Sequence, residues 1–72
     1  MIGEGLKVRF IPTFARNMHD TIEELAEKTI TGTICYINWE HQNFTVEFDC
    51  GGTKQKESFR FWEIGKAVKV IG

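Results

Sequence analysis

Hydrophobic and polar residues alternate in several short segments of the chain, a period that is typical of strands with one buried face. A further segment, residues 29–37, is rich in β-branched residues, which favour strands. In the first segment, Leu6, Val8 and Phe10 alternate with two charged residues. Proline cannot donate a hydrogen bond to a strand ladder, so we expect Pro12 to end this strand. The other predicted strands cover residues 29–37, 44–49, 54–61 and 67–71.

The connections between these segments carry turn signals. Residues 38–43 and 50–53 are polar or glycine-containing and predict two hairpin turns, and residues 63–65 predict one tight turn before the last strand. Gly32, inside the second predicted strand, indicates a bend or a bulge. Residues 13–19 have no regular pattern, and we expect an irregular loop there.

A short helix is predicted over residues 21–28. Asp20 is the expected N-cap, and Glu23 three residues later completes a capping box. Ile22, Leu25 and Ala26 form one apolar side of this helix. Because two helical turns are not stable alone, we expect that side to dock on the rest of the protein.

Five short antiparallel strands, with a long helix-bearing connection after the first, predict an all-β fold: a small closed barrel in a single domain over residues 1–72. In an OB-fold the helix usually lies between the third and fourth strands, whereas in an SH3-like barrel the longest loop follows the first strand. Only residues 50–53 separate the third and fourth segments here, which favours a five-stranded SH3-like barrel. Its predicted core consists of Val8, Phe10, Ile34, Val46, Phe48, Phe59 and Val68.

The small size of the chain limits its possible functions. It has 72 residues, 42% of them hydrophobic, and a domain of this length needs nearly all of its large apolar residues in the core. Few are then left to line a deep substrate pocket. No apolar run approaches the ~18 residues of a membrane span, and the N-terminal residues lack the basic and apolar regions of a secretory signal. With two cysteines and no such signal, we expect a cytoplasmic protein without membrane contact.

Residues suited to metal binding or nucleophilic catalysis are few. The soft metal ligands are His19, Cys35, His41 and Cys50. They lack the paired spacing of structural zinc sites, and no known local signature of a nucleophile surrounds Cys50. A hairpin in which Asn38 faces Phe44 would separate the two thiols by roughly 10 Å, too far for a disulfide. We therefore expect no catalytic residue, no metal, no cofactor and no enzymatic activity.

Aromatic residues divide into two groups. Phe10, Phe44, Phe48, Phe59 and Phe61 alternate with polar residues and are predicted to lie in the core. The others fall in predicted loops or on uncertain strand faces, and they are Phe14, Tyr36, Trp39 and Trp62. Because barrels of this type bind extended peptides through aromatic grooves, these four residues predict a site for a protein or peptide partner. The alternative interpretation is that both tryptophans cap the ends of the barrel and belong to its packing.

Charge is unevenly distributed along the chain. Residues 1–12 carry a net charge of +1, residues 13–53 carry −5 and residues 54–72 carry +3. In an SH3-like barrel the first and last strands are near neighbours, so their cations would form a basic strip suited to a nucleic-acid backbone. For this alternative partner the candidate residues are Lys7, Arg9, Lys54, Lys56, Arg60, Lys66 and Lys69. The competing interpretation is that these lysines protect edge strands against aggregation.

Four segments of the chain resemble those of a known group of proteins. These segments are KVRFIPTF (7–14), GTICYIN (32–38), ESFRFWEIG (57–65) and KAVKVIG (66–72). Together they are similar to short SH3-like barrel proteins encoded on mobile elements, conjugative transposons and prophages, of clostridia and related Gram-positive bacteria. The resemblance implies this fold and a bacterial cytoplasmic setting, and it implies no catalytic or binding residue.

Overall fold

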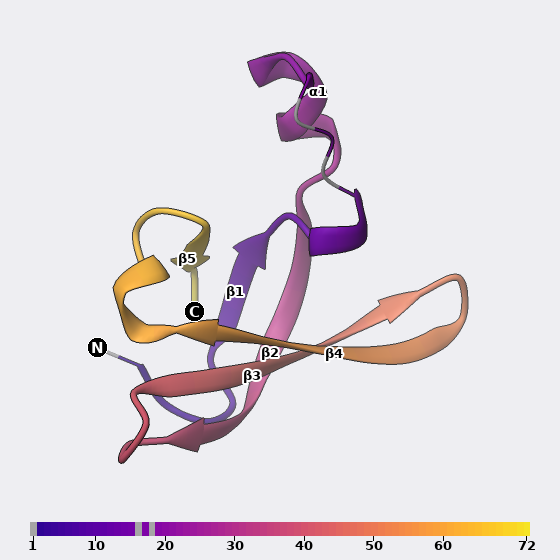
Figure 1. Cartoon of the computed structure of the whole chain (residues 1–72). Helices are drawn as coiled ribbons and strands as arrows, with labels where there is room; N and C mark the ends of the chain where they lie inside the picture. Colours follow the sequence, from indigo (N-terminus) through magenta and orange to yellow (C-terminus); the bar gives the residue numbers. More distant parts are fainter. Residues whose placement is uncertain (1, 16, 18) are drawn as a thin grey trace.

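Five antiparallel strands form one sheet (Figure 1). The computed structural model describes residues 2–15, 17 and 19–72. The strand order is β4-β3-β2-β1-β5. The strands are β1 (Lys7–Phe10), β2 (Ile30–Asn38), β3 (Asn43–Cys50), β4 (Thr53–Arg60) and β5 (Val68–Val70). The predicted all-β fold is confirmed, with the first and last strands side by side and the longest connection between β1 and β2, the arrangement of an SH3-like barrel.

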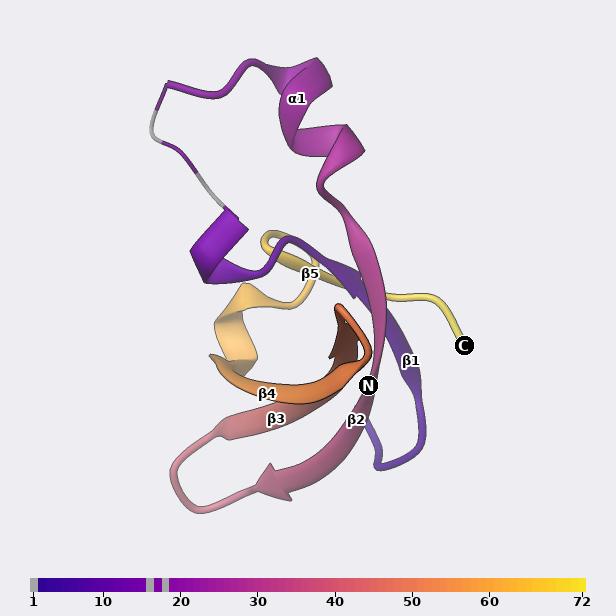
Figure 2. The ribbon, with the colours of Figure 1, turned by 90° about the vertical axis from the view of Figure 1, so that its right-hand side faces the viewer.

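The sheet curls strongly, but its two edge strands do not pair, so within the described residues no hydrogen-bonded ladder closes the barrel that the sequence predicted. No ladder joins β4 to β5 in the described part of the chain. Two short 3-10 turns, η1 (Thr13–Ala15) and η2 (Phe61–Glu63), cover the open side of the curl instead (Figure 2). The backbone N–H of Thr13 donates to the Glu57 carboxylate at 3.0 Å, which ties η1 to β4.

One apolar core fills the inside of the curl. All seven residues of the predicted core are buried, as is Phe44, which the aromatic pattern also placed in the core, and Ile2 and Ile37 join them. The ring of Phe10 packs edge-on against Phe48 and Phe59, with centroids 5.1 and 5.4 Å apart. Such edge-to-face pairs add to the free energy of burial itself. Phe61, also predicted in the core, is only half-buried because β4 ends one residue before it.

The pairing of β2 with β3 differs from the predicted hairpin. Asn38 faces Asn43 rather than Phe44, and the register shifts once more between Ile34 and Tyr36. The extra residue at this shift is Cys35, so β2 carries a bulge there, which bends the strand and increases its twist. Gly32 is not the bulge: it pairs with Val8 in a regular ladder, where the chains pack too closely for a side chain.

The helix α1 (Ile22–Glu27) begins one residue later than predicted. Its capping box consists of Thr21 and Glu24 rather than Asp20 and Glu23. Asp20 instead accepts hydrogen bonds from the Asn17 backbone at 2.9 Å and from the Lys28 ammonium at 2.7 Å. These local contacts compete with the N-cap role that the sequence suggested.

The expected docking of α1 is wrong. Apart from its C-terminal end, the helix stands clear of the sheet in Figures 1 and 2, and none of its residues is buried. Ile22 is 83% exposed. The capping box and the Asp20–Lys28 ion pair hold the two turns locally, in place of a packed apolar side. No helix in the described residues is long and apolar enough to cross a membrane.

Candidate functional site

The four aromatic residues predicted for partner binding are all exposed to solvent. The exposed fractions are 67% for Phe14, 56% for Tyr36, 63% for Trp39 and 66% for Trp62. Neither indole is enclosed at an end of the barrel, as the alternative interpretation required. Large apolar side chains that gather on a surface are more informative than single exposed ones, so their mutual arrangement decides what they can do.

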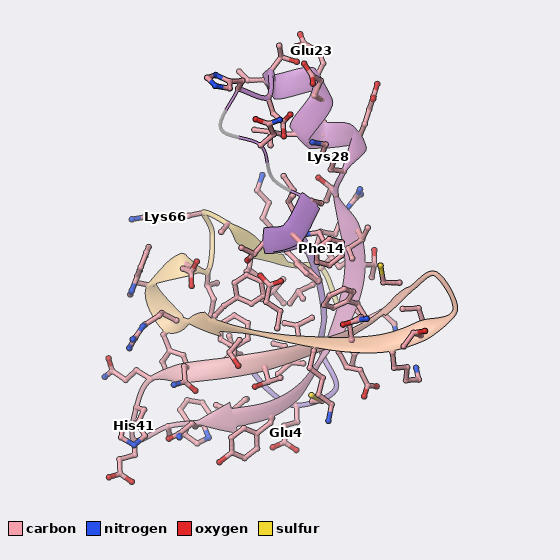
Figure 3. All side chains as sticks on the ribbon, turned by 45° about the vertical axis from the view of Figure 1, so that its right-hand side comes forward. Glu4, Phe14, Glu23, Lys28, His41 and Lys66 are labelled. Atoms are coloured by element: carbon pink, nitrogen blue, oxygen red, sulfur yellow. The ribbon has the colours of Figure 1, made fainter. Side chains whose placement is uncertain are left out.

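Two of the four, Trp39 and Trp62, lie next to the same residue, Phe61. Trp39 lies in the turn between β2 and β3, and its ring packs edge-on against Phe61 with centroids 5.5 Å apart. Trp62 follows Phe61 in η2. Phe14 instead stacks on Phe48, with centroids 6.4 Å apart. Figure 3 shows Phe14 far from His41, which lies in the same turn as Trp39. Tyr36 is separate again, since it pairs with Thr45 in the middle of the β2–β3 ladder.

Phe61 separates two adjoining hollows. The first, of about 300 Å³, is lined only by apolar side chains: Ile2, Trp39, Phe61 and Ile64. The second, of about 260 Å³, is mixed and is lined by His41, Gln42, Arg60, Phe61 and Trp62. We call Ile2, Trp39, Phe61, Trp62 and Ile64 the aromatic surface. It offers an apolar pocket beside a pocket that contains a cation, the usual combination at small recognition sites.

Backbone hydrogen bonds hold the two sides of this surface in place. The Phe61 N–H donates to the Gln42 carbonyl at 2.9 Å and so links η2 to the β2–β3 turn. Within the turn, the His41 N–H donates to the Asn38 side chain at 3.0 Å. Within η2, the Arg60 N–H donates to the Glu63 carboxylate at 2.7 Å. The aromatic surface therefore rests on two tied turns, which limits the entropy lost on binding.

Two cations lie at the edge of the aromatic surface. Arg60 lines the mixed hollow, and the Lys66 ammonium lies 5.7 Å from the centroid of the Trp62 ring. A cation at this distance from an indole face is attracted by the ring quadrupole. The described residues place no ion-pair partner on the Arg60 guanidinium, so its charge is directed at the solvent and at any ligand.

Three residues of this surface were missed by the sequence patterns. The alternation of residues 54–61 continues through Phe61 and predicts that its side chain lies in the core. Ile2 and Ile64 lie outside the alternating segments and gave no signal of their own. The available hint was Glu63, an acidic residue suited to the first turn of a new helical element, which would have ended the strand before Phe61.

The seven basic residues predicted for a nucleic-acid partner fall into three groups. Lys54 and Lys56 pair across β4–β3 with Asp49 and Glu47, and the Lys54 ammonium lies 3.5 Å from the Asp49 carboxylate. Arg60 belongs to the edge of the aromatic surface. The remaining four are associated with β1, with β5 and with the loop before it, and they are Lys7, Arg9, Lys66 and Lys69.

Thiols and imidazoles are scattered. Cys35 and Cys50 are both free thiols, and the Cys35 thiol faces the Thr45 carbonyl at 3.6 Å. Among the residues that the structure describes, no three His, Cys, Asp or Glu side chains come together in a way that could hold a metal ion.

No protein-family model matches this chain, and comparison with the curated proteins and with the solved structures found no similar protein. A function is therefore inferred from the surface of the chain itself. The similarity to proteins of mobile elements stays a prediction.

Proposed function

We propose that this chain is a non-catalytic interaction module that binds a short, extended segment of a partner protein at the aromatic surface. One observation carries the proposal: Trp39 and Trp62, both about two-thirds exposed, come from separate turns and flank two hollows that share Phe61. Exposed tryptophans in such a setting are the residue type that most often dominates binding energy.

The two hollows favour a particular order of side chains in the partner. The apolar hollow suits an aliphatic or proline side chain, because only Ile2, Trp39, Phe61 and Ile64 line it. The mixed hollow suits an acidic side chain, because Arg60 lines it and Lys66 approaches Trp62 beside it. Side chains two residues apart in an extended peptide lie on one face, about 6.6 Å apart. We expect an apolar residue and an acidic residue at this spacing.

A displayed library of random dodecapeptides, selected on the whole chain, tests the proposal. We expect enriched sequences to pair an apolar residue with an acidic one, and Trp39→Ala and Trp62→Ala each to weaken their binding at least tenfold. Tyr36→Ala is the matched control, because Tyr36 is similarly exposed but lies outside the aromatic surface. We expect it to change the affinity less than twofold. Equal enrichment on a Trp39→Ala/Trp62→Ala variant would contradict the proposal.

The resemblance of four segments to mobile-element proteins supports a bacterial, cytoplasmic setting for this module. Genes of conjugation, integration or phage functions beside the coding gene would support that setting. A neighbourhood of housekeeping genes in every genome that carries the gene would count against it.

A further inference from the structure

A third hollow, of about 330 Å³, lies where β1, β5 and the C-terminal end of α1 meet. It shares no residue with the aromatic surface itself, although Lys66, which lines it, also lies 5.7 Å from the Trp62 ring at the edge of that surface. Three cations line it, Arg9, Lys66 and Lys69, together with the uncharged residues Phe10, Thr29, Ala26 and Ala67. No carboxylate of the described residues is among its lining. We call the three cations and this space the cationic hollow.

The register of β1 with β5 brings two like charges together. Arg9 pairs directly with Lys69 across the ladder, and side chains in this position lie about 5 Å apart at Cβ, where like charges destabilise the pair. The lysines of β4 are placed differently, since Lys54 and Lys56 face Asp49 and Glu47. The lysines of β4 are therefore balanced by acidic residues of β3, whereas the cations of β1 and β5 face each other.

The two carboxylate side chains of residues 54–72 are engaged elsewhere. Glu57 accepts a hydrogen bond from Thr13, and Glu63 accepts one from the Arg60 backbone. Ion pairs in the described residues form only at Lys28 and Lys54. An anion from outside would relieve the repulsion between Arg9 and Lys69, and three convergent cations are suited to the oxygens of a phosphate group.

The cationic hollow opens onto a row of further donors. Lys7 lies two residues before Arg9 on the same strand face, about 6.6 Å along the strand. On the neighbouring strand β2, Thr31 pairs with Arg9 and Thr33 pairs with Lys7. The threonine hydroxyl groups therefore share this face with the cations. Lysine, arginine and threonine are common donors to nucleic-acid phosphates. A row of such groups fits a chain of phosphates better than one isolated phosphate.

We propose that the cationic hollow and the Lys7–Arg9 row bind the phosphate backbone of a single-stranded nucleic acid. The cations of this site lie on β1, on β5 and on the loop before β5, and α1 contributes only the uncharged Ala26, so no described helix presents cations to a duplex groove. No aromatic side chain other than the buried Phe10 lines the hollow, so base stacking is absent and sequence preference is weak. Apart from Lys66, which also approaches Trp62, the site shares no residue with the peptide site proposed above.

Fluorescence anisotropy with a labelled twelve-nucleotide oligothymidine tests this proposal on the whole chain at 20–200 mM salt. With three or four phosphates neutralised, log affinity is expected to fall against log salt with a slope of about −2 to −3. We expect Arg9→Gln/Lys69→Gln to weaken binding at 20 mM salt at least tenfold and to reduce the slope by about 1.4. The control variant Lys54→Gln/Lys56→Gln removes the same charge from β4, and it should change the affinity less than threefold.

Four other results would each contradict a part of the proposal. Absence of binding at 20 mM salt, or equal loss in the two double variants, would overturn the site. Tighter binding of a twelve-base-pair duplex would overturn the assignment to single strands, and saturation by inorganic phosphate at equal affinity would overturn the assignment to a nucleic acid. Because Arg9→Gln/Lys69→Gln relieves repulsion, its melting temperature should be unchanged or raised, so lost binding would not reflect unfolding. Trp39→Ala/Trp62→Ala should retain oligonucleotide binding.

Discussion

At the scale of single residues, Gly32 is the position with the least space. A Cβ atom there would lie 2.5 Å from a Val46 methyl carbon and 2.9 Å from both the Glu47 carbonyl and the Phe10 ring. Two of these neighbours are buried side chains of the core and one is backbone. None of them can move away without disturbing the inside of the curl.

We therefore expect Gly32→Ala to lower the free energy of unfolding by about 2–3 kcal/mol, as overpacking of a core does. Urea denaturation followed by tryptophan fluorescence measures this change. Gly3→Ala is the control, because an added Cβ at Gly3 would meet only a Leu6 methyl at an ordinary 3.9 Å. A loss as large in the control, or none at Gly32, would contradict the close packing described here.

The two indoles of the aromatic surface have different electrostatic surroundings. Trp62 has Arg60 in the same hollow and Lys66 over its ring, whereas Trp39 borders an apolar hollow. In the single-tryptophan variants Trp39→Phe and Trp62→Phe, we expect iodide to quench the indole at position 62 more efficiently than the one at 39. Caesium should show the reverse order. Identical iodide-to-caesium ratios for the two indoles would contradict this assignment.

At the scale of elements, α1 depends on contacts with its own flanks. The Lys28 ammonium, through its hydrogen bond, and the Asn17 N–H lower the pKa of Asp20 below its ordinary value of 3.8, against a smaller opposing effect of desolvation. Because the pKa of Asp20 is depressed in the folded state, the ionised carboxylate stabilises the fold, and this contribution is fully present above pH 3.8. It is lost as the pH falls through the lower, folded value.

The NMR signal of the Asn17 amide should report this titration. We expect it to move on acidification with a midpoint below 3.8 and to stop moving in Asp20→Asn. Lys28→Met removes the principal cause, so the midpoint should rise towards 3.8. A midpoint at or above 3.8 in the unsubstituted chain would contradict the ion pair as the cause.

The elements themselves were predictable to different degrees. The sequence patterns located all five strands within one or two residues: burial on one face imposes a period of two, and β2 is rich in β-branched residues. The β2–β3 register was not predictable, since the bulge at Cys35 leaves no local signature in residues 34–36. The helix start was displaced because Asp20 is held by Lys28, eight residues away, and single-sequence patterns do not contain such contacts.

At the scale of the whole molecule, Glu57 closes the open side of the sheet. Its register partner is the buried Val46, so it faces inwards at the edge of β4, where its carboxylate accepts hydrogen bonds from both the backbone N–H and the hydroxyl of Thr13. The stacking of Phe14 on Phe48 adds an apolar contact at the same place. The long connection between β1 and β2 is thereby fixed to the opposite edge of the sheet.

Removing this link in Glu57→Ala should lower the free energy of unfolding by about 1 kcal/mol, less than for a buried charged hydrogen bond because the link is exposed. It should also accelerate hydrogen exchange of the Ala15 amide, which donates to the Pro12 carbonyl within η1. Lys56→Gln, on the neighbouring residue of β4, should change stability by less than 0.5 kcal/mol, a typical value for the surface. Unaltered exchange at Ala15 would show that η1 is held by Phe14 alone.

The candidate site was predictable only in part for a reason that belongs to the whole fold. Exposure of Trp39 and Trp62 follows from their place in polar turns, and the sequence indicated both. Their convergence on Phe61 depends on the bond from Phe61 to Gln42, which joins turns nineteen positions apart. The separation of Phe14 and Tyr36 from them likewise depends on the curl of the sheet, which local patterns do not describe.

The position of Ile2 has a practical consequence. Its side chain is buried in the core and lines the apolar hollow with Trp39 and Ile64. Any polypeptide joined before Ile2, such as a purification tag, would begin beside the aromatic surface and compete with ligands for it. Gly72, by contrast, lies beside Lys7 through the bond from the Lys7 N–H. Fusions intended for partner screens therefore belong at the C-terminus, and those intended for oligonucleotide assays belong at the N-terminus.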